Sequence, residues 1–381
     1  MLNIILIFIG ICAILAEFFT IGLWINARWQ YKKEQAPSYS PKTSIIIPCK
    51  YAHERFKENV NAIINQEYKD YNVIFVTDST EDSAYRVVKE IAKYNKKIHL
   101  ETADPIKGCS GKIAALIKGV GSADDAEVFV FADSDIKPHK QWLKYLVGYL
   151  DDEKIGATTG YRWYFPNNLK SYFISTWNLT SVLPFFFPMF NYTWGGSTAM
   201  KKKVFDKLNV AEKWKKGFAD DLILTEALKK EEYKIKFVPK CLIENSAGDE
   251  GNFLNWGTRQ FTWVKWYYPF EYTVSFVRVV GVKVTMLFGI ILLYLGYTIQ
   301  GLLMVSSFFL EIIAGWQAIS TVKKLMFYPK KSTGSSLAYI LLMPFAMFVI
   351  AYNYISSLFT REVKWSGRKY NKREALSKKM I

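Results

Sequence analysis

The chain of 381 residues contains few cysteines, and none of them are spaced for metal binding. The four cysteines, Cys12, Cys49, Cys109 and Cys241, are widely separated and form no C-x-x-C pair. This arrangement argues against a zinc site and against a disulfide framework, and it fits a reducing cytoplasm.

Two common nucleotide-binding loops are also absent. The segment GCSGK at 108–112 has a glycine followed by a lysine, but Ile113 stands where a phosphate loop needs serine or threonine. No G-x-G-x-x-G opens the first expected helix, which argues against a dinucleotide oxidoreductase. Lys112 would begin a helix, and there it could still meet a phosphate.

Signatures of nucleic-acid binding are missing despite a net charge of +16. The sequence has no zinc-ligand spacing, no RNA-binding signature and no basic recognition helix. Its basic residues are scattered, and the densest group follows Arg361. A basic cluster next to a membrane segment attracts anionic lipid headgroups. We therefore expect a membrane surface as partner and no nucleic acid.

Apolar residues make up half of the chain, and aromatic residues make up 17%. Leu2 to Ile25 is long enough to span a bilayer and carries Glu17 as its single charged residue. It lacks the basic start and cleavage site of a signal peptide, so we expect a retained anchor. Arg28 and Lys32 follow it, which places the next domain in the cytoplasm by the positive-inside rule.

Three further apolar stretches lie near the C-terminus: Val279 to Gln300, Gly301 to Ser320 and Leu337 to Phe359. The first two are nearly continuous, so we expect a tight hairpin at Gln300 and Gly301. A loop containing Lys323, Lys324, Lys330 and Lys331 follows, and its charge predicts a cytoplasmic position. Pro344 allows the last stretch to be a broken or re-entrant segment, and the sequence leaves its topology open.

Between these regions, short buried strands alternate with helices, which predicts a mostly parallel sheet covered by helices on both faces. The expected fold class is therefore α/β. The expected strands are Ser44 to Pro48, Tyr71 to Thr77, Lys97 to Glu101 and the stretch from Val128, and the expected helices are Phe56 to Asn65, Ala84 to Tyr94 and Lys112 to Val120.

The stretch VFVFADSD at 128–135 ends in two carboxylates, Asp133 and Asp135. The carboxyl ends of strands in an open α/β sheet are where such folds bind ligands. Two carboxylates at this spacing can share a hard divalent cation that substrate phosphates complete. Alternatively, Asp135 caps the following helix. Asp78 ends another strand and could contact a nucleoside, or it could belong to a turn.

Later segments supply an interfacial stretch, a glycine turn and an acidic helix. Residues 171–194 are aromatic and contain two prolines, so we expect them to lie in the headgroup region rather than cross the bilayer. GGST at 195–198 predicts a flexible turn where backbone can approach a ligand. FADDLILTEAL at 218–228 predicts a helix whose first acids, Asp220 and Asp221, either favour its N-terminus or supply a general base.

Two more segments precede the C-terminal membrane region. Leu242 to Gly248 is expected to run from a strand into a loop. Trp256 to Phe276 is dense in tryptophan and tyrosine and is expected to form a helix at the membrane interface. This helix contains RQFTW, which includes Arg259 and Trp263.

Together these motifs resemble family 2 membrane glycosyltransferases, and most closely the ceramide glucosyltransferases of family 21. The matching features are SIIIPCK, Asp78, SGKIAAL, FADSD, the pair ADD, R-x-x-T-W and WSGRKY. The resemblance covers most of the chain. It implies a GT-A catalytic domain with a Rossmann-like fold, a uridine diphosphate sugar as donor, and Mg²⁺ or Mn²⁺.

The resemblance also implies roles for individual residues. Asp78 would contact the nucleoside, and Lys112 and Asp133 would contribute to donor binding. Asp133 and Asp135 would hold the metal, with Asp135 as the direct ligand. Asp221, next to Asp220, would be the catalytic base. Arg259 and Trp263 would bind substrate. They occupy the outer positions of a (Q/R)xxRW motif, but Thr262 stands where that motif has arginine.

The chemistry that the resemblance implies is transfer of a sugar, glucose in ceramide glucosyltransferases, to a membrane lipid such as ceramide. A single carboxylate base on the face opposite the leaving group predicts inversion at the anomeric carbon. Two alternatives stay open: a processive polysaccharide synthase of the same fold, and an inactive membrane adaptor. The sequence does not indicate an oligomeric state. The expected parts are an anchor (1–27), a cytoplasmic GT-A domain (40–255), an interfacial helix (256–276), membrane segments (277–360) and a basic cytoplasmic tail (361–381).

Overall fold

The computed structural model describes residues 1–32, 37–123, 125–245, 252–328, 333–365, 368–372 and 374. The chain forms two compact units. The helical unit contains Met1–Glu34, Tyr164–Leu183 and Glu250–Val363, and the sheet unit contains Gln35–Trp163, Pro184–Asp249 and Lys364–Ile381. Three parts of the sequence-based expectations fall outside the described residues. They are the loop at the end of 242–248, the lysines at 330 and 331, and residues 366–367 of WSGRKY.

The sheet unit is built on an eight-stranded sheet in the order β3-β2-β1-β4-β7-β6-β8-β5. Its strands are β1 (Thr43–Cys49), β2 (Tyr71–Thr77), β3 (Ile98–Thr102), β4 (Val128–Ala132), β5 (Ile136–Lys137), β6 (Ile155–Trp163), β7 (Ser197–Lys201) and β8 (Lys234–Asn245). Its helices are α2 (Phe56–Ile64), α3 (Ser83–Ala92), α4 (Gly111–Gly121), α5 (Trp142–Gly148), α7 (Lys202–Lys207), α8 (Val210–Trp214) and α9 (Asp220–Lys230).

The first half of the sheet is parallel, as the alternation of strands and helices predicts. β1 pairs in parallel with both β2 and β4, and β3 extends this half beyond β2. The direction then reverses, because β7 is antiparallel to β4, with Ala132 opposite Ser197. As a result, the segment that precedes β7 lies at the same edge as the carboxyl ends of β1, β2 and β4.

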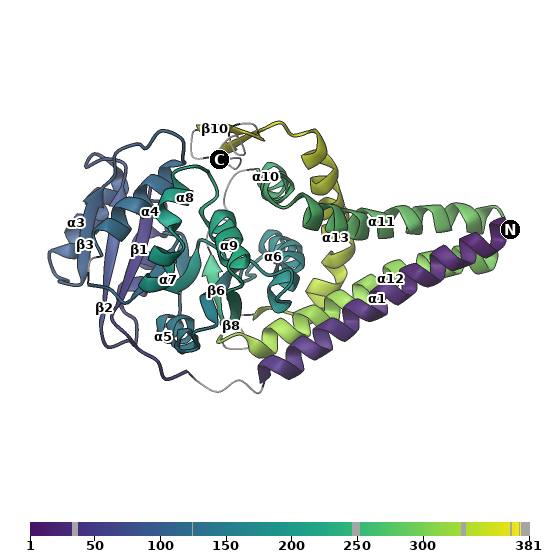
Figure 1. Cartoon of the computed structure of the whole chain (residues 1–381). Coiled ribbons are helices and arrows are strands. Elements are labelled where there is room, and N and C mark those ends of the chain that lie inside the picture. Colours follow the sequence, from purple (N-terminus) through teal and green to yellow (C-terminus); the bar gives the residue numbers. More distant parts are fainter. Residues whose placement is uncertain are drawn as a thin grey trace. The chain divides into compact units, whose positions relative to one another are not determined.

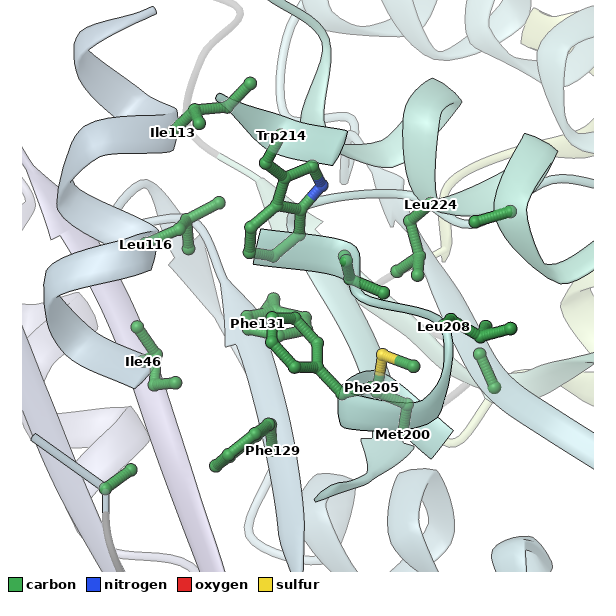
Figure 2. Packing of buried hydrophobic residues seen from close by; sticks show 14 of the residues in the cluster. Ile46, Ile113, Leu116, Phe129, Phe131, Met200, Phe205, Leu208, Trp214 and Leu224 are labelled. Carbon is green, nitrogen blue, oxygen red and sulfur yellow. The ribbon is translucent and has the colours of Figure 1, made fainter. Parts of the chain in front are cut away.

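The core of this unit forms where α4, α7, α8 and α9 cover the sheet (Figure 2). Phe131 of β4 lies at the centre, and the Trp214 ring of α8 packs edge-on against it, 5.1 Å between centroids. Ile113 of α4 and Leu224 of α9 approach from either side. Burying side chains of this size contributes about 1.5–3 kcal/mol each, which fixes the helices whose N-termini carry the polar residues described below.

The helical unit contains α1 (Leu2–Lys32), α6 (Leu169–Val182), α10 (Phe253–Tyr267), α11 (Pro269–Tyr294), α12 (Thr298–Leu325) and α13 (Ser336–Phe359). Among the described helices, α1, α11, α12 and α13 are long and apolar enough to cross a membrane. In Figure 1, α12 runs alongside α1. At 14 residues, α6 is shorter than the roughly 20 residues that a crossing needs.

Three details of the helical unit differ from the sequence-based expectations. The single helix expected over 256–276 is divided, because Pro269 starts α11 and cannot continue the hydrogen bonding of α10. The hairpin turn lies at Gly296 rather than at Gln300 and Gly301, since Gly296 has a φ of +86° that favours glycine. No broken segment occurs at Pro344, because α13 continues through it.

Candidate functional site

The polar residues after β2 and β4 lie at one edge of the sheet unit. Asp78 follows Thr77, the last residue of β2, and Asp133 follows Ala132, the last residue of β4. Because these parallel strands end at the same edge, both carboxylates face the region where α/β sheets bind ligands. Asp78 forms an ion pair with Lys50, 2.9 Å between Nζ and Oδ2, so its negative charge is balanced by the lysine side chain.

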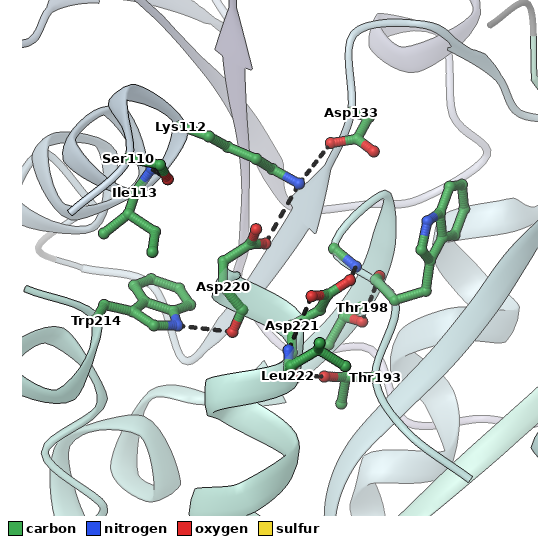
Figure 3. A network of polar contacts seen from close by, with 12 residues as sticks. Ser110, Lys112, Ile113, Asp133, Thr193, Thr198, Trp214, Asp220, Asp221 and Leu222 are labelled. Carbon is green, nitrogen blue, oxygen red and sulfur yellow. Dashed lines mark hydrogen bonds and ion pairs between the residues drawn. The ribbon is translucent and has the colours of Figure 1, made fainter. Parts of the chain in front are cut away.

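Lys112 lies between two carboxylates that come from distant parts of the chain (Figure 3). Its Nζ is 2.8 Å from Oδ1 of Asp133 and 3.3 Å from Oδ2 of Asp220. Ser110 caps α4 by accepting a hydrogen bond from the Ile113 amide, which fixes the turn that carries the lysine. Burial would lower the pKa of Lys112, but Asp133, Asp220 and Asp221 outweigh burial and raise that pKa. Lys112 therefore stays charged.

The acid pair Asp220 and Asp221 begins α9, where the positive end of the helix dipole favours acids. The indole of Trp214 donates to the Asp220 carbonyl at 2.9 Å, and the hydroxyl of Thr193 donates to the Asp221 carbonyl at 2.9 Å (Figure 3). These bonds fix the backbone at the helix start. The side chains are then held in different surroundings.

The Asp221 carboxylate accepts hydrogen bonds from two backbone amides, that of Leu222 at 2.8 Å and that of Gly195 at 3.4 Å. Asp221 is partly exposed, whereas Asp220 is only 4% exposed. Burial raises the pKa of Asp220 to about 7 and also raises the pKa of Asp221, although Lys112 opposes both shifts. A carboxylate with a raised pKa in such a position can accept a proton near neutral pH.

Gly195 and Gly196 bring the backbone against this cluster. A Cβ on Gly195 would lie 2.3 Å from Oδ2 of Asp220, and a Cβ on Gly196 would lie 2.8 Å from Oδ2 of Asp133. The turn predicted from GGST thus approaches the carboxylates closely, and its last two residues, Ser197 and Thr198, begin β7. Any larger residue at 195 would displace the acid.

The second carboxylate of the D-x-D motif, Asp135, accepts a hydrogen bond at 3.0 Å from the side-chain amide of Asn245, the last residue of β8. The side chains of Asp133 and Asp135 supply carboxylate oxygens, the ligand type that a hard divalent cation prefers. No group of three or more metal-binding side chains occurs among the described residues. The protein would therefore supply Asp133 and Asp135, and a diphosphate and water would complete the coordination.

Two of the predicted site residues belong to the helical unit. Arg259 and Trp263 lie on α10, and Trp263 contacts Trp266 and Tyr267 there. Thr262, which replaces the expected arginine, is fully buried and donates a hydrogen bond to the Thr258 carbonyl at 2.8 Å. The structure brings together Lys112, Asp133, Asp220 and Asp221 in the sheet unit, and the roles of Arg259 and Trp263 stay predictions.

Sequence reasoning did not identify several residues that shape this cluster. Trp214 and Thr193 carry no motif. The Trp214 contact spans only six residues, from α8 to the start of α9, whereas the Thr193 contact joins segments 28 residues apart. Asn245 could have been suspected, because a polar residue that ends a strand lies at a sheet edge where ligands bind. The direct pairing of Lys112 with Asp220 had no local signal.

A mannosyltransferase from Pyrobaculum calidifontis, solved in complex with GDP-Man and Mn²⁺, is similar to this chain in fold. The TM-score is 0.52, the identity is 16%, and 93% of this chain and 98% of that chain are covered. A protein of Haemophilus influenzae described as an uncharacterized glycosyltransferase is 28% identical over 111 residues, 29% of this chain. The matched segment spans about a third of that relative, 33% of its length.

The parallel-dominated sheet with carboxylates at its edge thus shares the fold of that solved structure. The family match of the sequence defines the class of protein, a glycosyltransferase. The sequence of nearly the whole chain then gives its family. Residues 4–376 match glycosyl transferase family 21, and the chain belongs to that family.

Proposed function

We propose that this glycosyltransferase moves glucose from a uridine diphosphate sugar to the hydroxyl of a membrane lipid such as ceramide, with inversion at the anomeric carbon. The observation that carries the proposal is the buried cluster in which Lys112 joins Asp133 to Asp220, with Asp221 beside it. Its parts match the two demands of the reaction, stabilising a diphosphate leaving group and accepting a proton.

Proton transfer is assigned to Asp221. Asp220 is buried and paired with Lys112. Asp221 is partly exposed, and in the contacts given above its carboxylate accepts hydrogen bonds from backbone amides only. The acceptor hydroxyl loses its proton to the Asp221 carboxylate while its oxygen bonds to the anomeric carbon. The bond from that carbon to the diphosphate breaks, and uridine diphosphate leaves with the bonding electrons. A positioned base of this kind contributes about 10²- to 10⁴-fold to the rate.

Leaving-group stabilisation is assigned to the other end of the cluster. Asp133 and Asp135 would hold Mg²⁺ or Mn²⁺, which supplies positive charge to the diphosphate oxygens when bound. Asn245 orients Asp135 for this role through its 3.0 Å hydrogen bond. Asp78, at the end of β2, would contact the nucleoside, and Lys112 stays charged beside the diphosphate. The sheet unit would lie on the cytoplasmic side.

A lipid acceptor is favoured over a growing polysaccharide. The chain has four helices long and apolar enough to cross a membrane among its described residues, which supports access to a lipid. The (Q/R)xxRW motif has Thr262 in place of arginine, and this threonine is used for a bond within α10. No cation therefore stands at this position to clamp a polymer.

The test uses the full chain purified into lipid nanodiscs that contain ceramide, together with Mn²⁺ and one nucleotide sugar at a time. The donors are UDP-glucose, UDP-galactose, UDP-N-acetylglucosamine and GDP-mannose. Mass spectrometry of the extracted lipids should show one added hexose with UDP-glucose. A long polymer would instead identify a polysaccharide synthase, and no product from any donor would support the inactive adaptor.

The stereochemistry of the product tests the mechanism separately. Because UDP-glucose carries an α-linked sugar, a single displacement gives a β-linked product. Nuclear magnetic resonance of the glycolipid should show the β anomer. An α-linked product would contradict the use of one base in a single displacement.

A further inference from the structure

The second of the two short strands that follow the last long helix belongs to the sheet unit. Strand β10 (Arg368–Asn371) pairs with β9 (Glu362–Trp365), and residues from Lys364 onward cluster with the sheet unit rather than with α13. The sequence predicted a basic tail at the membrane surface and included WSGRKY among the features that resemble the family, but it assigned no role to Arg368 or Tyr370.

Tyr370 anchors β10 on the sheet unit. Its side chain is 5% exposed, and its ring packs against the ring of Phe218, 4.8 Å between centroids. Phe218 stands two residues before Asp220, so the strand lies over the start of the acidic helix. Trp365 of β9 also contacts the Tyr370 ring, 6.3 Å between centroids.

Two contacts locate the strand on the sheet unit. Tyr370 packs on Phe218, which leads into α9 and the acid pair, and Arg368 lies against Gly111, the first residue of α4. The segments in contact with β10 are therefore those that carry Lys112 and the acid pair.

Arg368 lies two residues before Tyr370 and therefore projects from the same face of the strand. Its guanidinium is 3.5–3.7 Å from the position that a Cβ on Gly111 would occupy, and Lys112 is the next residue along α4. The Arg368 side chain is exposed and forms no ion pair with a carboxylate among the described residues. A planar guanidinium without a partner is suited to bind two phosphate oxygens at once.

We infer that Arg368 binds the diphosphate of the nucleotide-sugar donor, and that Tyr370 holds β10 in the position this requires. The inference rests on the proposed function and extends it to a residue from the opposite end of the chain. The Arg368 guanidinium could also bind the phosphate of a lipid headgroup, because that phosphate offers the same oxygen acceptors as the donor diphosphate. The donor is the better match because Gly111 and Phe218, which contact β10, both belong to the sheet unit that carries the carboxylate cluster.

The chain offers a matched control, because Lys369 is also exposed and basic but projects from the other face of β10. The variants Arg368→Gln and Lys369→Gln each remove one positive charge from adjacent positions. Thermal unfolding in detergent should give the same midpoint for both, since both side chains are exposed. A difference in ligand binding between them then reflects position rather than net charge.

The measurement is calorimetric titration of the full chain with UDP and, separately, with uridine, in the presence of Mn²⁺. We expect Arg368→Gln to weaken UDP binding roughly tenfold to hundredfold, the loss of a charge-assisted hydrogen bond, and to leave uridine binding unchanged. The donor KM should rise with little change in the lipid KM. Lys369→Gln should stay within about twofold of the unmodified chain.

Two results would overturn the inference, and they are distinguishable. If the unmodified chain binds UDP and Arg368→Gln binds it equally well, only the role of Arg368 is wrong. If the unmodified chain does not bind UDP at all, the proposed function fails and the donor role fails with it. Flotation with vesicles containing 30% phosphatidylserine completes the test. If Arg368→Gln weakened binding of the protein to these vesicles and left UDP binding unchanged, Arg368 would contact lipid instead of the donor.

Discussion

The two units of this protein contain buried charges that are balanced in different ways. In the helical unit, Lys283 of α11 pairs with Glu311 of α12 at 2.5 Å, and Arg278 of α11 pairs with Glu17 of α1 at 2.9 Å. Glu17 and Glu311 each pair with one base. In the sheet unit, Lys112 is shared by Asp133 and Asp220, and Asp221 lies beside them.

This difference separates a structural use of charge from a functional one. A matched pair within apolar helices satisfies both partners and connects the helices that carry them. A cluster with more acids than bases keeps a negative field that a metal ion can neutralise. The excess of acids, rather than burial alone, marks the sheet unit as the candidate site. Four predictions test this comparison.

The largest effect is expected from Asp221→Asn. An amide cannot accept the acceptor's proton, so the rate of transfer should fall by about 10²- to 10⁴-fold. Binding of UDP, measured by calorimetry, should change little because Asp221 is assigned to the acceptor side. Transfer at an unchanged rate would show that Asp221 is not the base.

Breaking the matched pair should destabilise the helical unit without a specific effect on chemistry. Lys283→Met leaves Glu311 as an unpaired acid, 7% exposed, and should cost about 3–5 kcal/mol of unfolding free energy. The double variant Lys283→Met with Glu311→Met should recover most of this loss, since no buried charge remains. Denaturant unfolding in detergent gives both values. A double variant as unstable as the single one would contradict the pairing.

Gly195→Ala should disturb the unbalanced cluster sterically. Its Cβ would lie 2.3 Å from the Asp220 carboxylate and 2.7 Å from Lys112 Nζ, and such overpacking costs about 1–3 kcal/mol. Gly22→Ala in α1 is the control, because no atom lies within 4 Å of a Cβ there. Thermal unfolding should shift for the first variant only. Equal shifts would show that the close approach at Gly195 is not required.

The smallest effect is a dependence of stability on pH. Burial raises the pKa of Asp220 from 3.8 to about 7, so the folded chain binds more protons than the unfolded chain between these values. Stability should therefore fall as pH rises through this range, by about 1 kcal/mol from pH 6 to pH 7. Asp220→Asn should flatten the slope in thermal unfolding measured across this range. An unchanged slope would assign the proton to another group.

Much of the fold followed from local patterns. The expected strands near 44, 71 and 128 agree with β1, β2 and β4, because short apolar runs bounded by polar residues are a local signal. The later strands β6 and β7 were not predicted. Their residues include the threonines at 158 and 159, which are polar yet buried, and both hydroxyls donate hydrogen bonds to carbonyls of other segments, Leu146 and Ser197.

The sequence by itself determined which residue types follow each strand, so local patterns alone were enough to single out the D-x-D motif, Asp78 and the acid pair. It also determined the long apolar helices and the family resemblance. Only the tertiary structure decided that Lys112 joins Asp133 to Asp220, and that Arg368 lies against Gly111. The physical reason is the distance along the sequence over which each kind of interaction acts. Periodicity and capping act over a few residues, whereas these contacts join segments that only sheet pairing and core packing bring together.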